Sequence, residues 1–379
     1  MRPRFCIGIE VIDDPAWMGG TLYLRNLAIS LASLPERERP ELCLLGSADA
    51  VSRVLEESGN PAAFSRRPPN QPFRLSRLLN WASRSKGIDV VYPGFGVAPR
   101  GALVLRWIPD FQHRYLPQLF SAAEIEQREH AIRGIAEHDN TVVVSSDVAK
   151  RDFEMFFPDH KATIRVWRFR SLIETTALPS RQAIAKFDLP EKYLYLPNQF
   201  WAHKNHIVVL RALARLRTLD LKVPLVCTGA TSDRRKAEHF DQLQRFITEN
   251  GLAGQVSILG LIERREQVEV LRHAAAIIQP SIFEGWSTVV EDARAAGKKI
   301  FLSDIPVHRE QNHPSAIYFN PQSDEELARL LKSEWEYLSS GYDRLSESTA
   351  RAKMAPLVIQ SAREFCAIAE DALRRRPRM

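Results

Sequence analysis

The segment Gln279 to Gly297 reads Q-P-S-I-F-E-G-W-S-T-V-V-E-D-A-R-A-A-G and indicates the fold of the chain. An apolar strand leads into a loop containing Gly285, and a helical pattern opens at Ser287 or Thr288. A strand, a loop and a helix in this order are typical of a parallel sheet, where ligands bind beyond the carboxyl ends of the strands. The helix start offers unpaired N–H groups and a partial positive charge, so the segment predicts a phosphate site.

Short apolar runs alternate with helical patterns on both sides of this segment, which predicts an α/β protein with two Rossmann-like halves. The predicted strands of the second half are Tyr193–Pro197, Leu225–Gly229, Gln255–Gly260, Ala276–Pro280, Lys299–Ser303 and Ala316–Phe319. Those of the first half are Arg4–Val11, Glu41–Ser47, Asp89–Gly94, Ala102–Pro109, Thr141–Ser146 and Thr163–Phe169. The predicted helices include Leu22–Leu34, His206–Leu216, Asp233–Asn250, Arg264–Ala274 and one from Asp324.

The periodicity lapses between Arg170 and Pro190, where we expect the domain boundary. The prediction is a first domain over residues 1–185 and a second over residues 186–355. One more helix is expected in residues 356–379, packing on either half.

Composition sets the class of protein. The chain has 379 residues, of which 45% are hydrophobic and 26% are charged, as in soluble proteins of two domains. No apolar run approaches the roughly 20 residues of a spanning helix, and no cleavable leader is recognised. Four widely spaced cysteines, Cys6, Cys43, Cys227 and Cys366, predict buried free thiols and a reducing, cytoplasmic setting.

The net charge of +6 arises from 52 basic and 46 acidic residues, a modest excess that does not imply nucleic acid as a partner. A phosphate-bearing substrate or an anionic membrane surface would explain it equally well.

Two acids flank the predicted helix start. Glu284 lies on the preceding loop, and Glu291 lies in the first helical turn, where it is able to accept hydrogen bonds from a ribose diol. Ser287 is positioned to cap the helix or to meet a phosphate oxygen. In the alternative, Glu291 only complements the helix dipole and Glu284 is a solvated loop residue. Spacing alone leaves both interpretations open.

Residues Pro197 to His206 read P-N-Q-F-W-A-H-K-N-H and follow the first strand of the second half. Lys204 is expected at the same edge of the sheet, where its ammonium suits a diphosphate. A lysine near a helix start is disfavoured by the dipole, which supports a functional role. His203 and His206 have no third partner at zinc-ligand spacing, so packing or capping is favoured over metal binding.

The first half carries weaker signals. Gly19 and Gly20 open a helix and allow close backbone approach to an anion. Asp110 and His113 follow another strand and are candidates for a base acting on an incoming hydroxyl. A capping Asp110 and a buried His113 are the alternative.

Taken together, these residues resemble the retaining glycosyltransferases of family 4. The resemblance extends from about Tyr193 to Leu330, through H-K-N-H, the Thr228-Gly229 pair, V-S-I-L-G at Val256–Gly260, and P-S-I-F-E-G-W-S-T-V-V-E-D-A. It implies the GT-B fold, with two facing Rossmann-like domains and an active site in the interdomain cleft.

By this resemblance, Glu284 contacts the donor sugar, Glu291 holds the ribose and Lys204 meets the diphosphate. Lys204, Glu284 and Asp110 are then the catalytic candidates. The implied donor-binding set also includes Gly19, Gly20, Asn198, Gly229, Gly285, Trp286, Ser287 and Thr288.

Three departures from the family pattern are visible. The two acids lie one residue closer together than the usual family spacing. Asn198 and Gln199 occupy the stretch where an arginine commonly shares the phosphate charge, which places more of the neutralisation on Lys204. Pro109 and Asp110 stand where a His-Asp pair is often found, so Asp110 is the matched residue.

The resemblance implies transfer of a hexose from a nucleotide diphosphate sugar to a hydroxyl of a glycan or lipid-linked acceptor, with retention, in bacterial surface polysaccharide synthesis. No cofactor and no obligatory metal are expected, since the sequence contains no Asp-x-Asp pair. The alternatives are a non-hydrolysing sugar-nucleotide epimerase and an inactive nucleotide-sugar-binding protein. The absence of Gly-x-Gly-x-x-Gly and Walker motifs disfavours dinucleotide oxidoreductases and kinases.

The segment Phe73–Lys86 places leucines on one helical face and basic residues elsewhere. This composition suits peripheral contact with an anionic membrane at the inner face of the cell membrane. The alternative is a helix whose apolar face packs on a core.

Overall fold

A computed structural model describes residues 5–14, 17–66, 87–96, 98–99, 101–173 and 180–376. The chain forms two compact units. The first comprises Met1–Phe111, Glu126–Leu172 and Ala355–Met379, and the second comprises Gln112–Ile125 and Ile173–Met354. The segment Phe73–Lys86 lies outside the described residues. Within them, no helix is long and apolar enough to cross a membrane.

The second unit is built on a six-stranded sheet in the order β10-β9-β8-β11-β12-β13, with every neighbouring pair parallel. Its strands are β8 (Leu194–Pro197), β9 (Leu225–Thr228), β10 (Val256–Ile258), β11 (Ala276–Gln279), β12 (Ile300–Ser303) and β13 (Ala316–Phe319). The first three strands run outward from β8, and the later three run outward on its other side from β11. The order therefore reverses between β8 and β11, as in doubly wound nucleotide-binding sheets.

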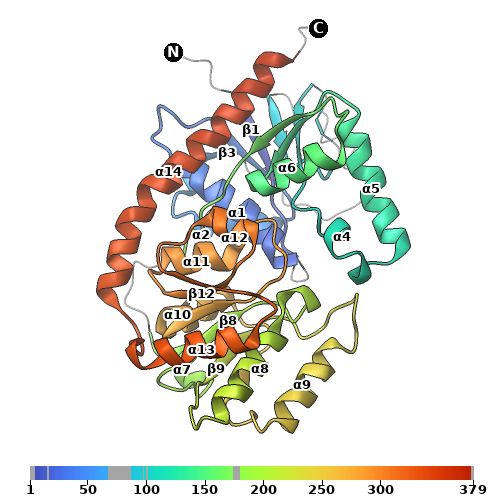
Figure 1. Cartoon of the computed structure of the whole chain (residues 1–379). Helices are drawn as coiled ribbons and strands as arrows, with labels where there is room; N and C mark the ends of the chain where they lie inside the picture. Colours follow the sequence, from blue (N-terminus) through green and yellow to red (C-terminus); the bar gives the residue numbers. More distant parts are fainter. Residues whose placement is uncertain are drawn as a thin grey trace. The chain divides into compact units, whose positions relative to one another are not determined.

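Helices cover both faces of this sheet (Figure 1). They are α7 (Gln182–Lys186), α8 (His206–Arg217), α9 (His239–Glu249), α10 (Arg264–His273), α11 (Thr288–Ala295), α12 (Pro306–Gln311) and α13 (Asp324–Glu334). The short helix α4 (Gln112–Tyr115), from earlier in the chain, also belongs to this unit. Short 3₁₀ turns lie at η3 (Pro117–Leu119), η4 (Ala202–Lys204) and η5 (Trp335–Tyr337).

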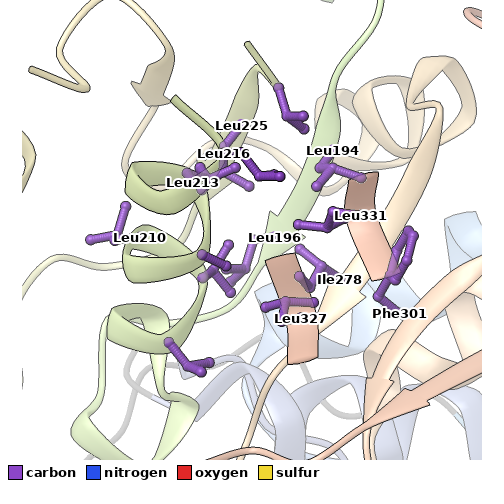
Figure 2. Packing of buried hydrophobic residues seen from close by; sticks show 14 of the residues in the cluster. Leu194, Leu196, Leu210, Leu213, Leu216, Leu225, Ile278, Phe301, Leu327 and Leu331 are labelled. Carbon is purple, nitrogen blue, oxygen red and sulfur yellow. The ribbon is translucent and has the colours of Figure 1, made fainter. Parts of the chain in front are cut away.

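The alternation of side chains along the strands divides the core of the second unit into two layers. Leu194 and Leu196 of β8 point to one face, where helices α8 and α13 supply most of the packing, as Figure 2 shows. Tyr193 and Tyr195 belong to the opposite layer, with residues of α7, α10 and α11. The inner strands β8, β9, β11 and β12 are thus buried on both faces, which explains their largely apolar sequences, whereas the edge strands β10 and β13 are partly exposed. Full burial of each leucine contributes about 1.5–3 kcal/mol.

The first unit has a seven-stranded parallel sheet in the order β3-β2-β1-β4-β5-β6-β7. Its strands are β1 (Cys6–Glu10), β2 (Glu41–Leu45), β3 (Phe64–Arg66), β4 (Val90–Tyr92), β5 (Leu103–Trp107), β6 (Thr141–Val144) and β7 (Thr163–Val166). Its helices are α1 (Met18–Ala32), α2 (Ala48–Glu57), α5 (Ala122–Ala136), of which residues from Glu126 belong to this unit, and α6 (Asp147–Phe156), with a 3₁₀ turn η2 (Pro61–Ala63).

The last helix, α14 (Arg344–Arg375), starts in the second unit and ends in the first (Figure 1). Its residues from Ala355 pack on the first unit, which answers the question that the sequence left open. The indole N–H of Trp167 donates to the Ser361 carbonyl at 2.9 Å, and the Phe365 ring meets Tyr92 edge-on at 5.0 Å. Pro356 lies inside this helix, so it did not mark the helix start that the sequence suggested.

Several predictions about elements differ from the structure. The division between the units falls after Leu172, which lies inside the predicted interval from Arg170 to Pro190 but before the bound at residue 185, and Gln112–Ile125 join the second unit. The short edge strand β3 was not predicted. Helix α9 starts at His239, not at Asp233, for a reason that lies in the site described next.

The α/β class and all of the predicted strands are present. The four cysteines are free and buried, as predicted. Burial raises the pKa of the Cys366 thiol to about 12, so it stays protonated and inert near neutral pH.

Candidate functional site

The predicted site residues of the second unit lie where two loops leave the switch point of the sheet. Strands β8 and β11 are hydrogen-bonded neighbours, with Leu194 opposite Ala276. Since the strands are parallel, the loops after Pro197 and after Gln279 leave the same edge. Crevices at such switch points are where open α/β sheets bind ligands.

The turn that carries Lys204 is tied to the loop after β11. Asn205 adopts the left-handed conformation, with φ of 57°. Its side-chain amide donates to the carbonyl oxygens of Pro280 at 3.1 Å and of Pro321 at 2.8 Å. The N–H of Ile282 donates to the His203 carbonyl at 2.9 Å. These bonds hold the two loops together. Asn205 and His203 of the H-K-N-H segment therefore have a structural role, in addition to any role of the segment in ligand binding.

Asp233 supports the same turn from the end of β9. One carboxylate oxygen accepts from the N–H of Ala202 at 3.1 Å, and the other accepts from the N–H of Arg235 at 3.0 Å. The Arg235 guanidinium lies 5.0 Å from the Trp201 ring centroid and donates to Gln112 at 3.0 Å. Because Asp233 and Arg235 are engaged in this anchor, the chain here does not form the first turns of α9.

Lys204 and Glu284 meet in an ion pair. Their Nζ and Oε1 atoms are 2.6 Å apart, and the side chains are only 14% and 10% exposed. Gln279 Nε2 donates to the same Glu284 oxygen at 2.9 Å and to Ser287 Oγ at 3.0 Å, while Asn198 Nδ2 donates to Gln279 Oε1. The structure thus joins four predicted residues, Lys204, Glu284, Ser287 and Asn198, in one network centred on Gln279.

Helix α11 begins behind this pair. Ser287 is its N-cap residue by position, but its hydroxyl makes no capping hydrogen bond, contrary to one of the predicted roles. Instead, the Ser287 N–H donates to Gln311 Oε1 at 3.1 Å, and Gln311 Nε2 donates to the Ser287 carbonyl at 3.0 Å. The side chain of Gln311 therefore fixes the helix start from α12.

Glu291 is fully buried, with 0% exposure. Its Oε1 accepts from Gln311 Nε2 at 3.2 Å, and its Oε2 lies 3.6 Å from Arg294 Nε. The carboxylate is held inside the protein and is not presented at the surface, although its place in the first turn of α11 still lets it complement the helix dipole. The alternative in which Glu284 is a solvated loop residue does not hold, since that side chain is only 10% exposed. Contact with a ribose would require the Gln311 or Arg294 contacts to yield.

His308 lies near the Lys204–Glu284 pair. Its Nδ1 is 2.9 Å from the Ser303 carbonyl oxygen, and Ser303 Oγ donates to the Ser281 carbonyl at 2.6 Å. Burial lowers the pKa of His308 to about 4, with Glu284 opposing that shift and Lys204 adding to it. The ring is therefore neutral, and we assign its proton to Nδ1, which donates to Ser303.

His203 and His206 are packing residues. Both are buried, and the imidazole of His206 stacks on Phe200 with ring centroids 4.3 Å apart. Burial lowers the pKa of His206 to about 3 and holds that of His203 well below its usual range. Within the part of the chain that the structure describes, no group of three or more His, Cys, Asp or Glu side chains is placed to share a metal ion.

The predicted glycines have different surroundings. Gly229 has φ of +134°, and a Cβ there would lie 2.3 Å from the Asn198 carbonyl oxygen, so it permits close approach of two chain segments. A Cβ on Gly20 would lie 2.7 Å from the Trp17 ring, so that space is taken by an aromatic side chain. Nothing lies within 4 Å of a Cβ placed on Gly19.

The remaining predicted donor-binding residues lie around the start of α11. Trp286 is buried at 8% exposure, whereas Gly285 and Thr288 are half-buried. They follow Glu284 directly along the chain and therefore belong to the same loop and helix start.

Asp110 and His113 belong to different units, the first and the second respectively. Asp110 is 28% exposed and lies 3.9 Å from the Arg128 guanidinium. His113 is buried in α4 and packs edge-on against Phe120. The structure thus gives Asp110 and His113 different surroundings, and a catalytic role for Asp110 stays a prediction.

Sequence reasoning missed Gln279, Gln311 and His308 as members of the site. A signal existed for Gln279, because a polar side chain ends a strand that is otherwise fully apolar. Gln311 and His308 lie on a different βα unit, and no local pattern connects them to Glu284.

Comparisons with known proteins identify similar sequences and folds. Residues 180–344 match the family model described as glycosyl transferases group 1. The O-antigen chain mannosyltransferase RfbU of Salmonella typhimurium is 25% identical over 162 residues, which are 42% of this chain and 43% of that protein. The aligned part thus spans less than half of the relative.

Solved structures align along nearly the whole chain. A glycosyltransferase from Rickettsia africae has a TM-score of 0.63 at 15% identity, covering 99% of this chain and 100% of its own. Anabaena HepE, solved with UDP and glucose, has a TM-score of 0.64 at 14% identity, covering 97% and 100%. WaaG, a glycosyltransferase involved in lipopolysaccharide biosynthesis, has a TM-score of 0.57 at 14% identity, covering 97% and 98%. The chain therefore has the GT-B fold.

Proposed function

We propose that the chain is a retaining glycosyltransferase, since residues 180–344 match the family model of glycosyl transferases group 1. It moves a hexose from a nucleotide diphosphate sugar to a hydroxyl of a glycan or lipid-linked acceptor in polysaccharide synthesis. The single observation that supports this best is the Lys204–Glu284 ion pair, 2.6 Å long, at the switch point of the sheet. It offers a cation for a diphosphate and a carboxylate for sugar hydroxyls side by side.

In the proposed reaction, the Lys204 ammonium turns from Glu284 toward the diphosphate of the donor. The carboxylate of Glu284 is then released to accept hydrogen bonds from the hexose, while Gln279 keeps it in place through its 2.9 Å bond. Fixed charges in a site shielded from water stabilise a leaving group more than they do in bulk solvent. Since no arginine follows β8, Lys204 carries this role without a second cation from that loop.

The bond between the anomeric carbon and the diphosphate oxygen breaks, and its electrons leave with the nucleoside diphosphate. The acceptor hydroxyl oxygen bonds to the anomeric carbon from the same face, and its proton passes to the departing phosphate oxygen. The chain's contribution is positional and electrostatic. Glu291 and Gln311 hold the start of α11 next to this site, and Glu291 is our candidate for ribose recognition.

The test compares two lysine variants in the full chain. Lys204→Met removes the ammonium, and we expect kcat for transfer to fall by about 10²–10³-fold, as when one transition-state donor is removed. Lys186→Met is the matched control, because its pair with Glu266 is also 2.6 Å long but lies on the surface, with the lysine 60% exposed. This control should transfer at the wild-type rate.

The assay supplies several UDP- and GDP-hexoses with saccharide acceptors and measures free nucleoside diphosphate and glycosylated product. Near-normal turnover in Lys204→Met would refute the assigned role of the lysine. Interconversion of the donor without release of nucleoside diphosphate would identify an epimerase instead. Binding of donor without either product would identify a protein that only holds the nucleotide sugar.

A further inference from the structure

The first unit carries an aromatic cluster at the carboxyl edge of its sheet that none of the predicted roles uses. The indole of Trp107, at the end of β5, stacks on Tyr23 with centroids 4.0 Å apart and planes at 4°. Trp17 stacks on the same indole at 5.3 Å and 13°. Phe95, in the loop after β4, lies 6.0 Å from Trp17 and 6.2 Å from Trp107. We call Trp17, Phe95 and Trp107 the aromatic platform.

The platform differs from an ordinary core cluster in its exposure. Phe95 is 52% exposed, and Trp17 is half-buried, whereas Trp107 beneath them is 9% exposed. The Trp107 indole N–H is buried, and no described residue accepts a hydrogen bond from it. Buried donors are almost always paired in proteins, so this donor beside exposed rings is available to an acceptor that a ligand supplies.

The exposed ring is held on a fixed loop. Glu10 accepts hydrogen bonds from the N–H of Phe95 at 2.6 Å and of Gly96 at 3.1 Å. Arg106 donates to the Gly94 carbonyl at 2.9 Å, and Gly94 has φ of +75°, with no room for a Cβ beside Val104. A half-exposed ring on a loop tied by three hydrogen bonds is pre-organised, which lowers the entropy lost when a ligand is bound.

The chemistry of the surroundings selects a neutral, ring-shaped ligand. Asp13 and Asp14 precede Trp17, and the Trp17 N–H donates to the Asp14 carbonyl at 3.0 Å, which keeps the acidic turn beside the rings. Asp13 is paired with Arg53 at 2.8 Å. Acidic groups at this edge, Glu10, Asp13 and Asp14, outnumber the basic groups Arg53 and Arg106, and this excess opposes a phosphate, so a nucleotide or an anionic lipid headgroup is disfavoured. Aromatic faces with a few polar groups suit a ligand that is apolar on its faces and polar at its edges.

We propose that the aromatic platform is the subsite for a pyranose ring of the acceptor, which makes a saccharide, and not a simple alcohol or a protein side chain, the substrate that receives the hexose. The C–H bonds on one face of the sugar lie on Phe95 and Trp17, and a ring hydroxyl oxygen accepts from the Trp107 indole N–H. This inference rests on the proposed transferase function for its biological meaning, but the binding itself does not.

The test measures saccharide binding to the full chain with no donor present. Methyl α-mannopyranoside and methyl β-galactopyranoside are titrated, and saturation transfer from protein to sugar protons is recorded by NMR. Small ligands of this size bind with roughly millimolar dissociation constants. We expect transfer mainly to protons on one face of the sugar, and competition by UMP or GMP to be absent.

Two variants separate stacking from mere apolar contact. Phe95→Ala should weaken binding about ten-fold, and Phe95→Leu, which keeps an apolar side chain but no flat face, should weaken it nearly as much. Tyr337→Ala is the control, because that ring is 83% exposed and lies in the second unit. Since Phe95 is half in solvent, neither substitution should unfold the protein, which a thermal melt verifies.

Wild-type affinity in Phe95→Leu, or displacement of the sugar by nucleotides, would overturn the proposal. If the saccharide binds at Phe95 but no donor is consumed, the transferase function fails and the saccharide site stands. If transfer occurs with an acceptor KM that Phe95→Ala leaves unchanged, the transferase function stands and the platform is not its acceptor subsite.

Discussion

A buried ion pair at the start of α14 gives a sharp prediction about stability. Arg272, in the last turn of α10, donates through Nε and NH2 to the two carboxylate oxygens of Glu347 at 2.7 and 2.8 Å. The side chains are 6% and 1% exposed. We consider Arg272→Met, which removes the guanidinium but keeps an apolar chain of similar reach, so that Glu347 is left as a buried carboxylate.

The cost follows from the loss of one partner of a buried pair. Removing one such partner typically destabilises by about 3–5 kcal/mol, because the other charge stays buried without compensation. Arg351 lies 3.4 Å from Glu347 and keeps part of the compensation, so we expect the lower end, about 3 kcal/mol. For a unit of this size each kcal/mol lowers Tm by about 2–4 °C, which gives a decrease of roughly 6–12 °C.

Urea unfolding and calorimetry of the full chain measure this change, following the transition assigned to the second unit. The double variant Arg272→Met/Glu347→Leu replaces the pair by apolar side chains and should recover most of the loss. Lys299→Met is the control, since its pair with Glu334 is 2.9 Å long but about a third exposed, and it should cost under about 1 kcal/mol. A loss below about 1 kcal/mol in Arg272→Met, with no recovery in the double variant, would refute the reasoning.

Two further predictions concern Gly297 and Lys298, which lie in the turn between α11 and β12. Gly297→Ala should destabilise the second unit by roughly 1–3 kcal/mol, because φ is +66° and the new Cβ would lie 2.5 Å from the Ser346 carbonyl oxygen; a Tm equal to wild type would contradict this. Burial lowers the pKa of Lys298 from 10.5 to about 8, so above pH 8 the unfolded state binds more protons and stability should rise with pH, by up to about 1.4 kcal/mol per unit. Below pH 8 this contribution is flat. The urea midpoints of wild type and of Lys298→Met are measured between pH 7 and 9.5. Their difference isolates the contribution of Lys298 from that of other titrating groups, and a difference that does not change with pH would contradict the prediction.

The sequence predicted the inner strands of the second unit well because they are buried on both faces. Leu194 and Tyr195 pack in opposite layers, so no polar residue interrupts the run, and such runs between helical patterns indicate a parallel sheet. The unit boundary was harder to predict, since it depends on contacts and not on local pattern. Residues 112–125 follow a strand of the first unit, yet the Gln112 side chain is bound by Arg235 of the second.

The site was predicted in part for a similar reason. Lys204, Glu284 and Ser287 each follow a strand of one sheet, and parallel strands bring their carboxyl ends to one edge, so their meeting follows from topology. What joins them is Gln279, whose two donors and one acceptor are all used within the network. The partners of Glu291 come from α12 and from its own helix, and the link to Gln311 spans 20 residues. Such contacts arise from tertiary packing, which a pattern along the chain does not encode.

The pairing of Lys204 with Glu284 has a consequence for the proposed reaction cycle. Before the donor binds, the ammonium is already compensated by a carboxylate at 2.6 Å, so a diphosphate must compete with Glu284 for it. That competition weakens the hold on both donor and product, and it favours release of the nucleoside diphosphate after transfer. Interactions that are stronger in the transition state than in the ground state are the ones that accelerate a reaction. Lys204 meets this condition if its ammonium moves from Glu284 to the diphosphate during the reaction. Its attraction to the leaving group then grows as the bond between the sugar and the diphosphate breaks and negative charge develops.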